Sequence, residues 1–164
     1  MTASEGDGNG WVVSAGGDRR WGRFGAAGLL LRAADPTDPD TPLVLLQHRA
    51  VWTASGDTWA LPGGARDSHE TVEEAAVREA AEEAGLQAGQ LTVRATVVTH
   101  EVPGWSYTTV IADAAEQLPT IANRESAELR WVAEAQVAAL PLHPGFAASW
   151  QRLREVTAEL PLKP

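Results

Sequence analysis

The chain has 164 residues, a formal net charge of −9 and 44% apolar residues, and it contains no cysteine. This length and composition allow one domain with a sizeable core. The lack of cysteine excludes disulfides, thiolate metal sites and thiol catalysis, and the acidic balance argues against binding of duplex nucleic acid through a broad basic face. Because the sequence shows no long apolar run and no secretory signal, we expect a cytoplasmic protein without a membrane span.

The first segment, Met1–Gly10, is rich in glycine and acidic residues, and this composition is typical of disorder. A single domain is therefore expected over residues 11–160. Its first element is predicted to be a small hairpin, formed by Trp11–Val13 and Arg20–Arg23 on either side of Gly16–Gly17.

Apolar or alternating runs predict the strands that follow. Phe24–Arg32 and Leu43–His48 are apolar runs, and Ala33–Pro42 between them is predicted as an exposed turn because of its acidic residues and prolines. Further strands are expected at Trp59–Leu61, Leu91–Thr99, Tyr107–Asp113 and Leu129–Val132. Pro62–Gly64 is predicted to end the first of these and open a loop.

A helix is predicted to begin at Thr71, because Thr71 and Glu74 have the spacing of a capping box, and to end at Gly85. The remaining helices are expected near Ala133–Leu140 and over Ala147–Glu159, with a loop at Pro141–Phe146 between them. Strands before, between and after these helices indicate an α+β fold in which helices flank a mixed sheet.

The helix that begins at Thr71 carries Glu79, Glu82 and Glu83, and their spacing places them on one helical face. Clustered carboxylates repel each other, and a divalent cation bound through oxygen ligands would offset that cost. The opposite side is expected to pack on the sheet through small residues, Val77, Ala80, Ala81 and Ala84. The carboxylates would then face outward, and a solvated acidic face is the alternative for three glutamates alone.

The residues around these glutamates have a characteristic spacing. Along the chain it reads Gly64, five residues, Glu70, seven residues, Arg78–Glu79, two residues, Glu82–Glu83, one residue, Gly85 and Leu86. This pattern resembles the box of the Nudix hydrolases, with Ala80 where a larger aliphatic residue is common. The resemblance implies an αβα sandwich around a mixed sheet, dependence on Mg²⁺ or Mn²⁺, and attack of water on phosphorus in a nucleoside diphosphate linked to another group.

The resemblance also implies roles for the residues of the box. The implied metal ligands are the three carboxylates and a main-chain carbonyl, Glu79, Glu82, Glu83 and Gly63. Arg78 would hold these carboxylates by pairing, and Glu70 would brace the loop behind them. A surface helix pair for Arg78 and a helix-start charge for Glu70 are the structural alternatives. One glutamate of the cluster could be the general base, but the pattern does not select which.

Further candidates lie outside the box. Gln47–Ala50 resembles the segment in which MutT-type members of the family carry a phosphate-contacting arginine, which would be Arg49. Arg23, just before the first long strand, is a second candidate, and either arginine could simply lie at the surface. Glu125 matches the position of an extra metal-binding glutamate, with Glu128 as the second choice and a solvated loop carboxylate as the alternative.

The segment Leu142–Phe146 falls where MutT-type members recognise the purine. His143 could donate or accept a hydrogen bond at the base edge, and Phe146 could stack on the base. The structural alternative is a Phe146 that belongs to the core and a His143 that is exposed.

The first hypothesis is a MutT-type pyrophosphatase that converts purine nucleoside di- or triphosphates to the monophosphate, with 8-oxo-dGTP or 8-oxo-dGDP as substrate. Its basis is a resemblance to an actinobacterial sanitation-type group, carried by WGRFGAAGLLL, LPGGARDSHET, RESAELRWV and PLHPGFAASWQRLR. A hydrolase of ADP-ribose or a dinucleotide is the second hypothesis, since Pro103 lies roughly where ADP-ribose members carry a proline. A non-catalytic nucleotide sensor is the third, and the complete set of box glutamates argues against it. A homodimer through Trp11–Trp21 stays open, because many Nudix proteins dimerise through N-terminal strands.

Overall fold

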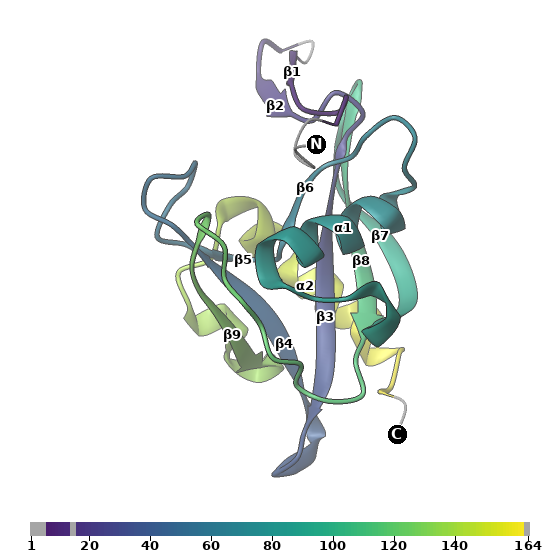
Figure 1. The fold of residues 1–164 in the computed structure, drawn as a ribbon, viewed down its shortest axis with the longest axis vertical. Coiled ribbons are helices and arrows are strands. Elements are labelled where there is room, and N and C mark those ends of the chain that lie inside the picture. The colour runs from purple at the N-terminus through teal and green to yellow at the C-terminus, as the bar shows by residue number, and fades with distance from the viewer. Residues whose placement is uncertain (1–5, 14–15, 163–164) are drawn as a thin grey trace.

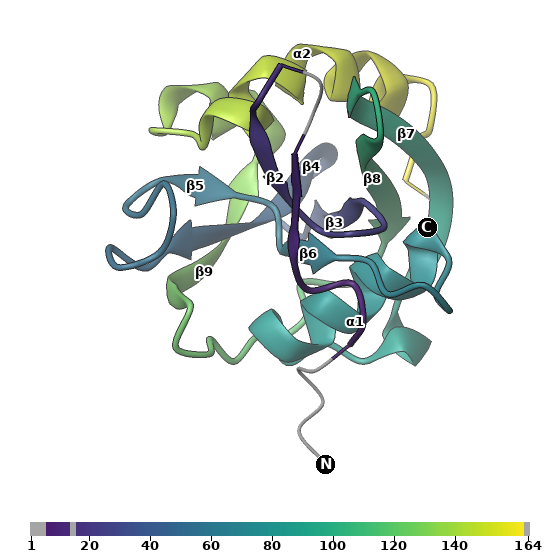
Figure 2. The ribbon, with the colours of Figure 1, turned by 90° about the horizontal axis from the view of Figure 1, so that it is seen from above.

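The computed structural model describes residues 6–13 and 16–162. A mixed sheet, which has seven strands in the described residues, lies between helix α1 (Val72–Ala84) and helix α2 (Pro144–Ala158). The domain therefore has three layers, which the view from above shows most clearly (Figures 1 and 2). This confirms the α+β sandwich predicted from the sequence. Within the described residues, no helix combines the length and the apolar character needed to cross a membrane.

The strands of the sheet are β3 (Ala26–Asp35), β4 (Asp38–Arg49), β5 (Trp59–Ala60), β6 (Gly63–Ala65), β7 (Thr92–Val102), β8 (Trp105–Asp113) and β9 (Ser126–Ala133). Their order is β5-β4-β3-β8-β7, with β6 beside β3 and β9 beside β4. Strands β3 and β8 run parallel, and the other pairs are antiparallel. Two short 3₁₀ turns, η1 (Ala88–Gln90) and η2 (Glu134–Ala139), complete the chain path.

The sheet divides where β3 and β4 diverge, and we call this place the fork. These two strands pair from Arg32 and Val44 toward the tip of their hairpin. On the other side of that point β3 pairs with β6, with Gly28 opposite Gly63, whereas β4 pairs with β5. Leu61–Pro62 joins β5 to β6 and so crosses from one branch to the other. The glycine-rich backbone of β6 therefore lies where β3 and β4 diverge.

Apolar side chains alternate between the two faces of the sheet, as strand geometry requires. The face under helix α1, the α1 face, contains Leu29, Leu31, Leu45, Val110 and Ala112. The face under helix α2, the α2 face, contains Leu30, Val44, Leu46 and Ile111, covered by Phe146, Trp150 and Leu153 of the helix. The two helices are thus held by separate apolar clusters on opposite sides of the fork.

The hairpin between β3 and β4 is longer than the sequence predicts. An exposed turn is predicted over Ala33–Pro42, but β3 continues to Asp35 and β4 begins at Asp38, so that prediction is wrong. Pro42 is tolerated because the pairing of β4 with β9 starts only at Leu43, and no strand on that side needs a proline amide.

Two boundaries near the fork also differ from the prediction. The residues predicted as a loop after Pro62 form strand β6, because the glycines that weaken the strand signal still pair with β3. Helix α2 begins at Pro144 rather than Ala147, so the predicted loop is shorter. Proline suits the first turn of a helix, and His143 caps that turn by accepting a hydrogen bond at Nδ1 from the Gly145 N–H at 3.0 Å.

The predicted N-terminal hairpin is present as β1 (Trp11–Val13) and β2 (Arg19–Trp21), and it projects from the body of the domain (Figure 1). The prediction of disorder falls partly outside the described residues, which begin at residue 6. The rest of that segment lies against the loop before α1, where the Gly8 N–H donates to Asp67 Oδ1 at 2.9 Å.

Candidate active site

Helix α1 positions the carboxylates because the local sequence fixes both of its ends. The Glu74 N–H donates to the Thr71 hydroxyl, and the Glu74 carboxylate accepts from the Thr71 N–H, which confirms the predicted capping box. Gly85 ends the helix with φ of +72°, a left-handed conformation that favours glycine, and its N–H donates to the Ala81 carbonyl. The carboxylates of the last two turns are therefore held in register with the sheet.

The face that α1 buries is rotated from the predicted one. The fully buried alanines are Ala75, Ala76, Ala80 and Ala84. Ala81 is exposed and Val77 only partly buried, so the predicted packing face is wrong at these two positions. Glu83 does not face outward either, since the residue is only 5% exposed. A helix with alanine on several sides has no strong apolar stripe, so contact with the sheet decides its rotation.

Glu83 and Glu79 lie against the glycines of β6. The Gly63 N–H donates to Glu83 Oε2 at 2.8 Å. At Gly64, a Cβ atom would lie 2.6 Å from the carboxyl carbon of Glu79, so any side chain there would displace that carboxylate. Glycine at these two positions therefore lets two carboxylates approach the backbone of the fork.

Arg78 links the carboxylates to the loop before the helix. Its Nη1 lies 3.0 Å from Glu79 Oε1 and 3.4 Å from Glu82 Oε1. On the other side, its Nε and Nη2 donate to the two oxygens of Glu70 at 2.7 and 2.9 Å. Glu70 also accepts from the Asp67 N–H at 2.9 Å, and it is buried. Arg78 thus makes contacts well beyond those of a surface helix pair, and Glu70 fastens both Arg78 and the loop.

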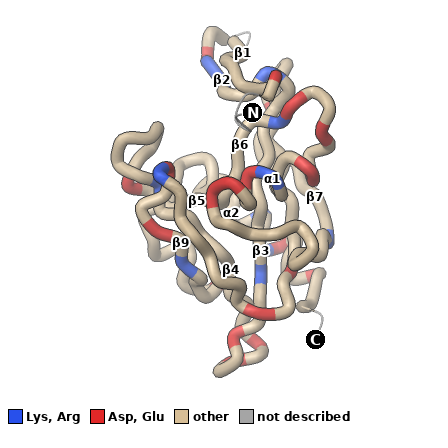
Figure 3. Tube along the Cα trace, viewed as in Figure 1, with Lys and Arg blue, Asp and Glu red and all other residues tan. Residues whose placement is uncertain are grey.

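The cluster carries more negative charge than Arg78 balances. Burial raises the pKa of Glu79 to about 7 against the pull of Arg78, and the charges of Glu82 and Glu125 add to the rise. Burial and the neighbouring Glu79 raise the pKa of Glu83 well above its usual value. For Glu70, burial opposes ionisation, but the hydrogen bonds from Arg78 and Asp67 outweigh it and keep the pKa below its usual value. Figure 3 shows this concentration of acidic residues on α1.

The donor chemistry of the cluster fits a hard divalent cation, because carboxylate oxygens are the ligands that Mg²⁺ and Mn²⁺ prefer. A second acidic group, Asp67, His69 and Glu70, brings one ligand atom from each residue within 4.8 Å of the others. There, however, the Arg78 guanidinium already lies 3.8 Å from Asp67 and 2.7 Å from Glu70. Both Glu70 oxygens accept from that guanidinium. In the described residues, by contrast, only one oxygen of Glu79 faces Arg78 and Glu83 pairs with no arginine, so Glu79 and Glu83 are the better candidates.

The structure separates the two predicted candidates for an extra metal ligand. Glu125 is exposed, and its charge raises the pKa of both Glu79 and Glu83. Two residues earlier, the Asn123 side-chain amide donates to the Glu82 carbonyl at 3.2 Å, which holds this loop against α1. The Glu125 main-chain carbonyl accepts from the Ala50 N–H at 3.0 Å, which ties this loop to the end of β4. Glu128 instead pairs with Arg130 at 3.0 Å. The geometry therefore favours Glu125.

Arg49 and His143 also lie near the fork. Arg49 donates from Nε and Nη2 to the Ala54 carbonyl at 2.9 and 2.7 Å, and its charge acts on Glu83. Burial lowers the pKa of His143, and the charge of Arg49 lowers it further. The His143 N–H donates to the Trp59 carbonyl at 2.8 Å, which fastens the loop before α2 to β5. These two predicted residues therefore share one region with the carboxylates.

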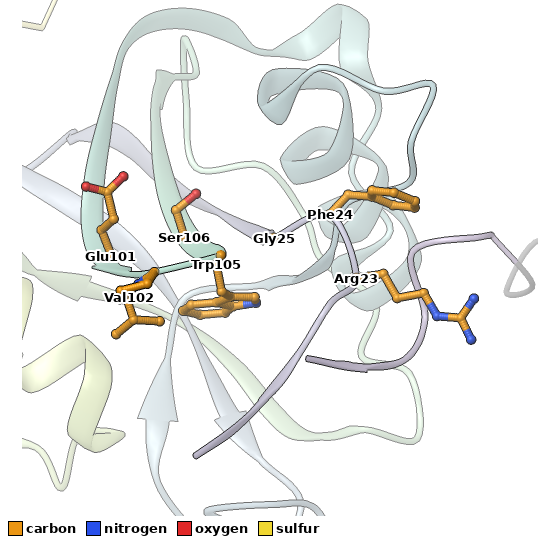
Figure 4. Close-up of a pocket in the computed structure, with 9 residues that line it drawn as sticks. Arg23, Phe24, Gly25, Glu101, Val102, Trp105 and Ser106 are labelled. Atoms are coloured by element: carbon orange, nitrogen blue, oxygen red, sulfur yellow. The ribbon is translucent and has the colours of Figure 1, made fainter. Parts of the chain in front are cut away.

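Two other predicted residues lie elsewhere. Phe146 is 7% exposed and packs on Trp150 with ring centroids 5.4 Å apart, so the structure places it in the core, as its structural alternative states. Arg23 lines a pocket of about 640 Å³ with Phe24 and Trp105, and none of the box residues lines that pocket (Figure 4).

The sequence analysis did not single out Tyr107, the only tyrosine of the chain. Its side chain reaches from β8 over Gly28 of β3, where a Cβ atom would lie 1.8 Å from the tyrosine hydroxyl oxygen. Only the register of two strands distant in sequence brings these residues together. No local signal in the sequence could have identified the pair.

The chain matches known proteins over most of its length. A family model described as the NUDIX domain matches residues 25–156. A Mycobacterium tuberculosis protein provisionally named 8-oxo-dGTP diphosphatase 3 is 68% identical over 162 residues, which cover 96% of this chain and 74% of that protein. A nucleoside triphosphate pyrophosphatase/Nudix hydrolase fusion protein of Bifidobacterium longum is 36% identical over 156 residues, 93% of this chain and 32% of that protein. The crystal structure of a Nudix hydrolase from M. smegmatis, RenU, has a TM-score of 0.92 and 70% identity, and covers 96% of this chain and 99% of that one.

Proposed function

The chain belongs to the Nudix hydrolase family, and we propose that it hydrolyses nucleoside di- or triphosphates to the monophosphate, with 8-oxo-dGTP and 8-oxo-dGDP as its substrates. One observation carries the reaction: Glu79 and Glu83 lie together at the fork with raised pKa values, an arrangement that a divalent cation would stabilise. The provisional name of the M. tuberculosis relative, at 68% identity, supports the substrate class.

Mg²⁺ or Mn²⁺ is the proposed cofactor. The residues that would hold it are Glu79, Glu82, Glu83, Glu125 and the carbonyl of Gly63. When bound, such a cation neutralises phosphate charge and makes a coordinated water more acidic.

The other residues of the site would position the carboxylates and the nucleotide. Arg78 holds Glu79 and Glu82 in place, and Glu70 holds Arg78. Arg49 would contact a phosphate of the substrate, because its positive charge lies beside the cluster. His143, in the loop fastened to β5, would contact the edge of the purine. The α1 side of the fork would thus hold the reacting phosphates, and the α2 side the nucleoside.

Substitution of Glu79 tests whether this site is catalytic. Glu79→Gln keeps the shape of the side chain and removes the negative charge that the cation requires. We expect hydrolysis to be lost while the protein stays folded. If Glu79→Gln left hydrolysis intact, the metal assignment would be wrong. A wild-type protein that bound nucleotides without cleaving them would instead support the sensor hypothesis.

A substrate panel tests the substrate class. The wild-type protein would be assayed with Mg²⁺ and 8-oxo-dGTP, 8-oxo-dGDP, dGTP, ADP-ribose or NADH, and the products would be identified as phosphate, pyrophosphate or AMP. We expect the highest kcat/KM with the two oxidised guanine nucleotides. Turnover of ADP-ribose or NADH with none on any guanine nucleotide would overturn this part of the proposal.

The proposal also includes a cytoplasmic location and a homodimer that forms through Trp11–Trp21. The exposure of Trp11 (53%) and Trp21 (44%) on the β1–β2 hairpin supports an interface there. Sedimentation of the wild type and of Trp11→Ala measures this directly, and a monomeric wild type would exclude the dimer.

A further inference from the structure

Tyr107 occupies a position on the α2 face that a glycine leaves open. Along β8, Ile111 belongs to the α2 cluster, so the alternation of the strand places Thr109 and Tyr107 on the same face. Gly28 of β3 lacks a side chain there, and the Tyr107 ring takes up the space: a Cβ on Gly28 would lie 1.8 Å from the hydroxyl oxygen and 2.9 Å from Cζ. The same oxygen lies 3.1 Å from the Cβ position of Gly63. The hydroxyl is therefore at the fork, over both glycines.

The surroundings of this hydroxyl are charged. Burial raises the pKa of Tyr107, the carboxylates of Glu83 and Glu79 raise it further, and Arg49 acts in the opposite direction. A phenol ordinarily holds its proton at neutral pH and can donate a hydrogen bond. The Tyr107 hydroxyl forms no side-chain hydrogen bond with any of the described residues. The hydroxyl of Thr109, next on the same face, does have a partner, since it lies 2.9 Å from the Thr99 hydroxyl.

We propose that the Tyr107 hydroxyl donates a hydrogen bond to a non-bridging oxygen of the phosphate attached to the nucleoside, and that Tyr107 is thus a substrate-binding residue. This inference rests on the proposed function. A phosphate oxygen suits the position, because the hydroxyl lies on the α2 face, where the nucleoside would bind, and beside Gly63, whose N–H meets the Glu83 carboxylate. A purely structural role would need only the ring over Gly28, and phenylalanine would fill that space equally well.

Tyr107→Phe separates these two roles, because it removes the hydroxyl and keeps the ring. For a hydrogen bond to a charged acceptor, we expect kcat/KM for 8-oxo-dGTP to fall about 10- to 100-fold, with no change in Tm. The loss should be the same factor for dGTP, since both nucleotides carry the same phosphates. Unchanged kinetics would assign Tyr107 a structural role, and a loss confined to one base would assign the hydroxyl to the base. Either result overturns the proposal.

Thr99→Val is the matched control, because it removes a hydroxyl from the same face of the neighbouring strand where a protein partner is already present. We expect kcat/KM within about twofold of wild type, as for a neutral hydrogen bond outside the site. If Thr99→Val lowered kcat/KM as much as Tyr107→Phe does, removal of any hydroxyl from this face would impair the enzyme. The effect of Tyr107→Phe would then not indicate a contact with the substrate, and the proposal would be overturned.

A second readout does not depend on turnover. Tyr107 is the only tyrosine, so the wild-type chain labelled with 3-fluorotyrosine has a single ¹⁹F resonance. In the presence of Mg²⁺, we expect the non-hydrolysable analogue α,β-methylene-dGTP to shift this resonance further than Mg²⁺ alone, and 2′-deoxyguanosine not to. A resonance that the analogue leaves unmoved, or that the nucleoside shifts equally, overturns the proposal. A wild type without hydrolytic activity would overturn the proposed function, while this measurement would still show whether a phosphate reaches Tyr107.

Discussion

The fork and the far end of β3 both hold charged side chains out of water, but they balance charge differently. At the far end, Asp113 accepts from Arg32 Nε at 2.8 Å and from Arg94 Nη1 at 2.5 Å. Arg32 is only 1% exposed, and its other N–H groups donate to the carbonyls of Thr157 and Leu160 at 3.3 and 2.7 Å. This cluster pairs one carboxylate with two arginines, and it fastens the C-terminal end of α2 and the residues after it to the sheet.

At the fork the balance is reversed, since Arg78 faces Glu70, Glu79 and Glu82, and Glu83 lies beside them. Burial, together with this excess of negative charge, raises the pKa values of Glu79 and Glu83. A buried carboxylate that is fully paired with arginines serves to hold the fold, whereas carboxylates in excess of their cationic partners are costly to bury until a ligand relieves them. The difference indicates which of the two clusters is structural and which is functional, and substitutions in each can test it.

The largest effect is expected from the cluster at the fork. Glu83→Gln removes a negative charge that a bound cation needs. We expect transition-state stabilisation to fall by about 4 kcal/mol or more, which lowers kcat by roughly 1,000-fold or more. The Tm of the metal-free protein should not fall, because a carboxylate that resists ionisation has been removed. Steady-state kinetics and thermal melts measure both. A clear drop in Tm would mean that Glu83 is structural, like Asp113.

The Asp113 cluster at the far end of β3 should respond in the opposite way. Asp113→Asn leaves the buried Arg32 without its counter-charge, so we expect a loss of about 3 kcal/mol in the free energy of unfolding, with kcat/KM of the folded protein unchanged. Urea unfolding measures the stability. The exposed Asp40→Asn is the matched control, and it should change stability by less than about 0.5 kcal/mol. A stable Asp113→Asn variant with impaired kinetics would contradict the comparison.

The link between Arg78 and the loop gives an intermediate effect. Glu70→Gln weakens the two hydrogen bonds that hold Arg78 in place. Because residues that orient metal ligands typically contribute about 10- to 100-fold to activity, we expect activity to fall by about that factor. Glu73→Gln, in the first turn of α1 and exposed, is the control for a helix-start charge. Equal kinetics for the two variants would mean that Glu70 acts only as such a charge.

The pKa of Glu79, about 7 against an ordinary 4.5, predicts opposite pH trends for stability and metal binding. Because the folded-state pKa is raised, the protonated group contributes stability below pH 4.5, and this contribution is lost as the pH rises through about 7. A cation needs the ionised group, so Mg²⁺ affinity should fall as the pH drops below about 7, by up to about tenfold per pH unit for one displaced proton. Melts of the metal-free protein and Mg²⁺ titrations from about pH 5 to 8 measure the two trends. Glu79→Gln should weaken the pH dependence of both stability and Mg²⁺ affinity. If stability and Mg²⁺ affinity changed in the same direction with pH in the wild type, the interpretation would be contradicted.

The smallest effect is expected at the exposed rim of the cluster. Glu125→Gln should raise the Mg²⁺ concentration for half-maximal activity about 5- to 10-fold, because the charge count of the ligands tunes affinity. Glu128→Gln, whose carboxylate already pairs with Arg130, should leave it unchanged. The reverse result would restore Glu128 as the candidate.

Much of the site could be predicted from the sequence because the relevant signals are local. The capping box at Thr71, the glycine end at Gly85 and the helical spacing of Glu79, Glu82 and Glu83 all lie within one helix and its caps. The rotation of α1 could not be predicted, since Ala81 and Ala84 are equally apolar and only the sheet distinguishes them. For the same reason Phe146 remained a candidate until its packing on Trp150 was known.

The sequence by itself determined the α+β sandwich, the ends of α1 and the set of carboxylates, because hydrophobic alternation, capping and the spacing of a helix act between residues close in the chain. Only the tertiary structure decided that Glu83 is buried, that Arg32 meets Asp113, and that Tyr107 lies over Gly28. These contacts join residues from different elements, and they depend on strand register, the divergence of β3 from β4 and the rotation of a helix. Burial and charge balance, which separate the functional cluster from the structural one, arise only when those elements pack.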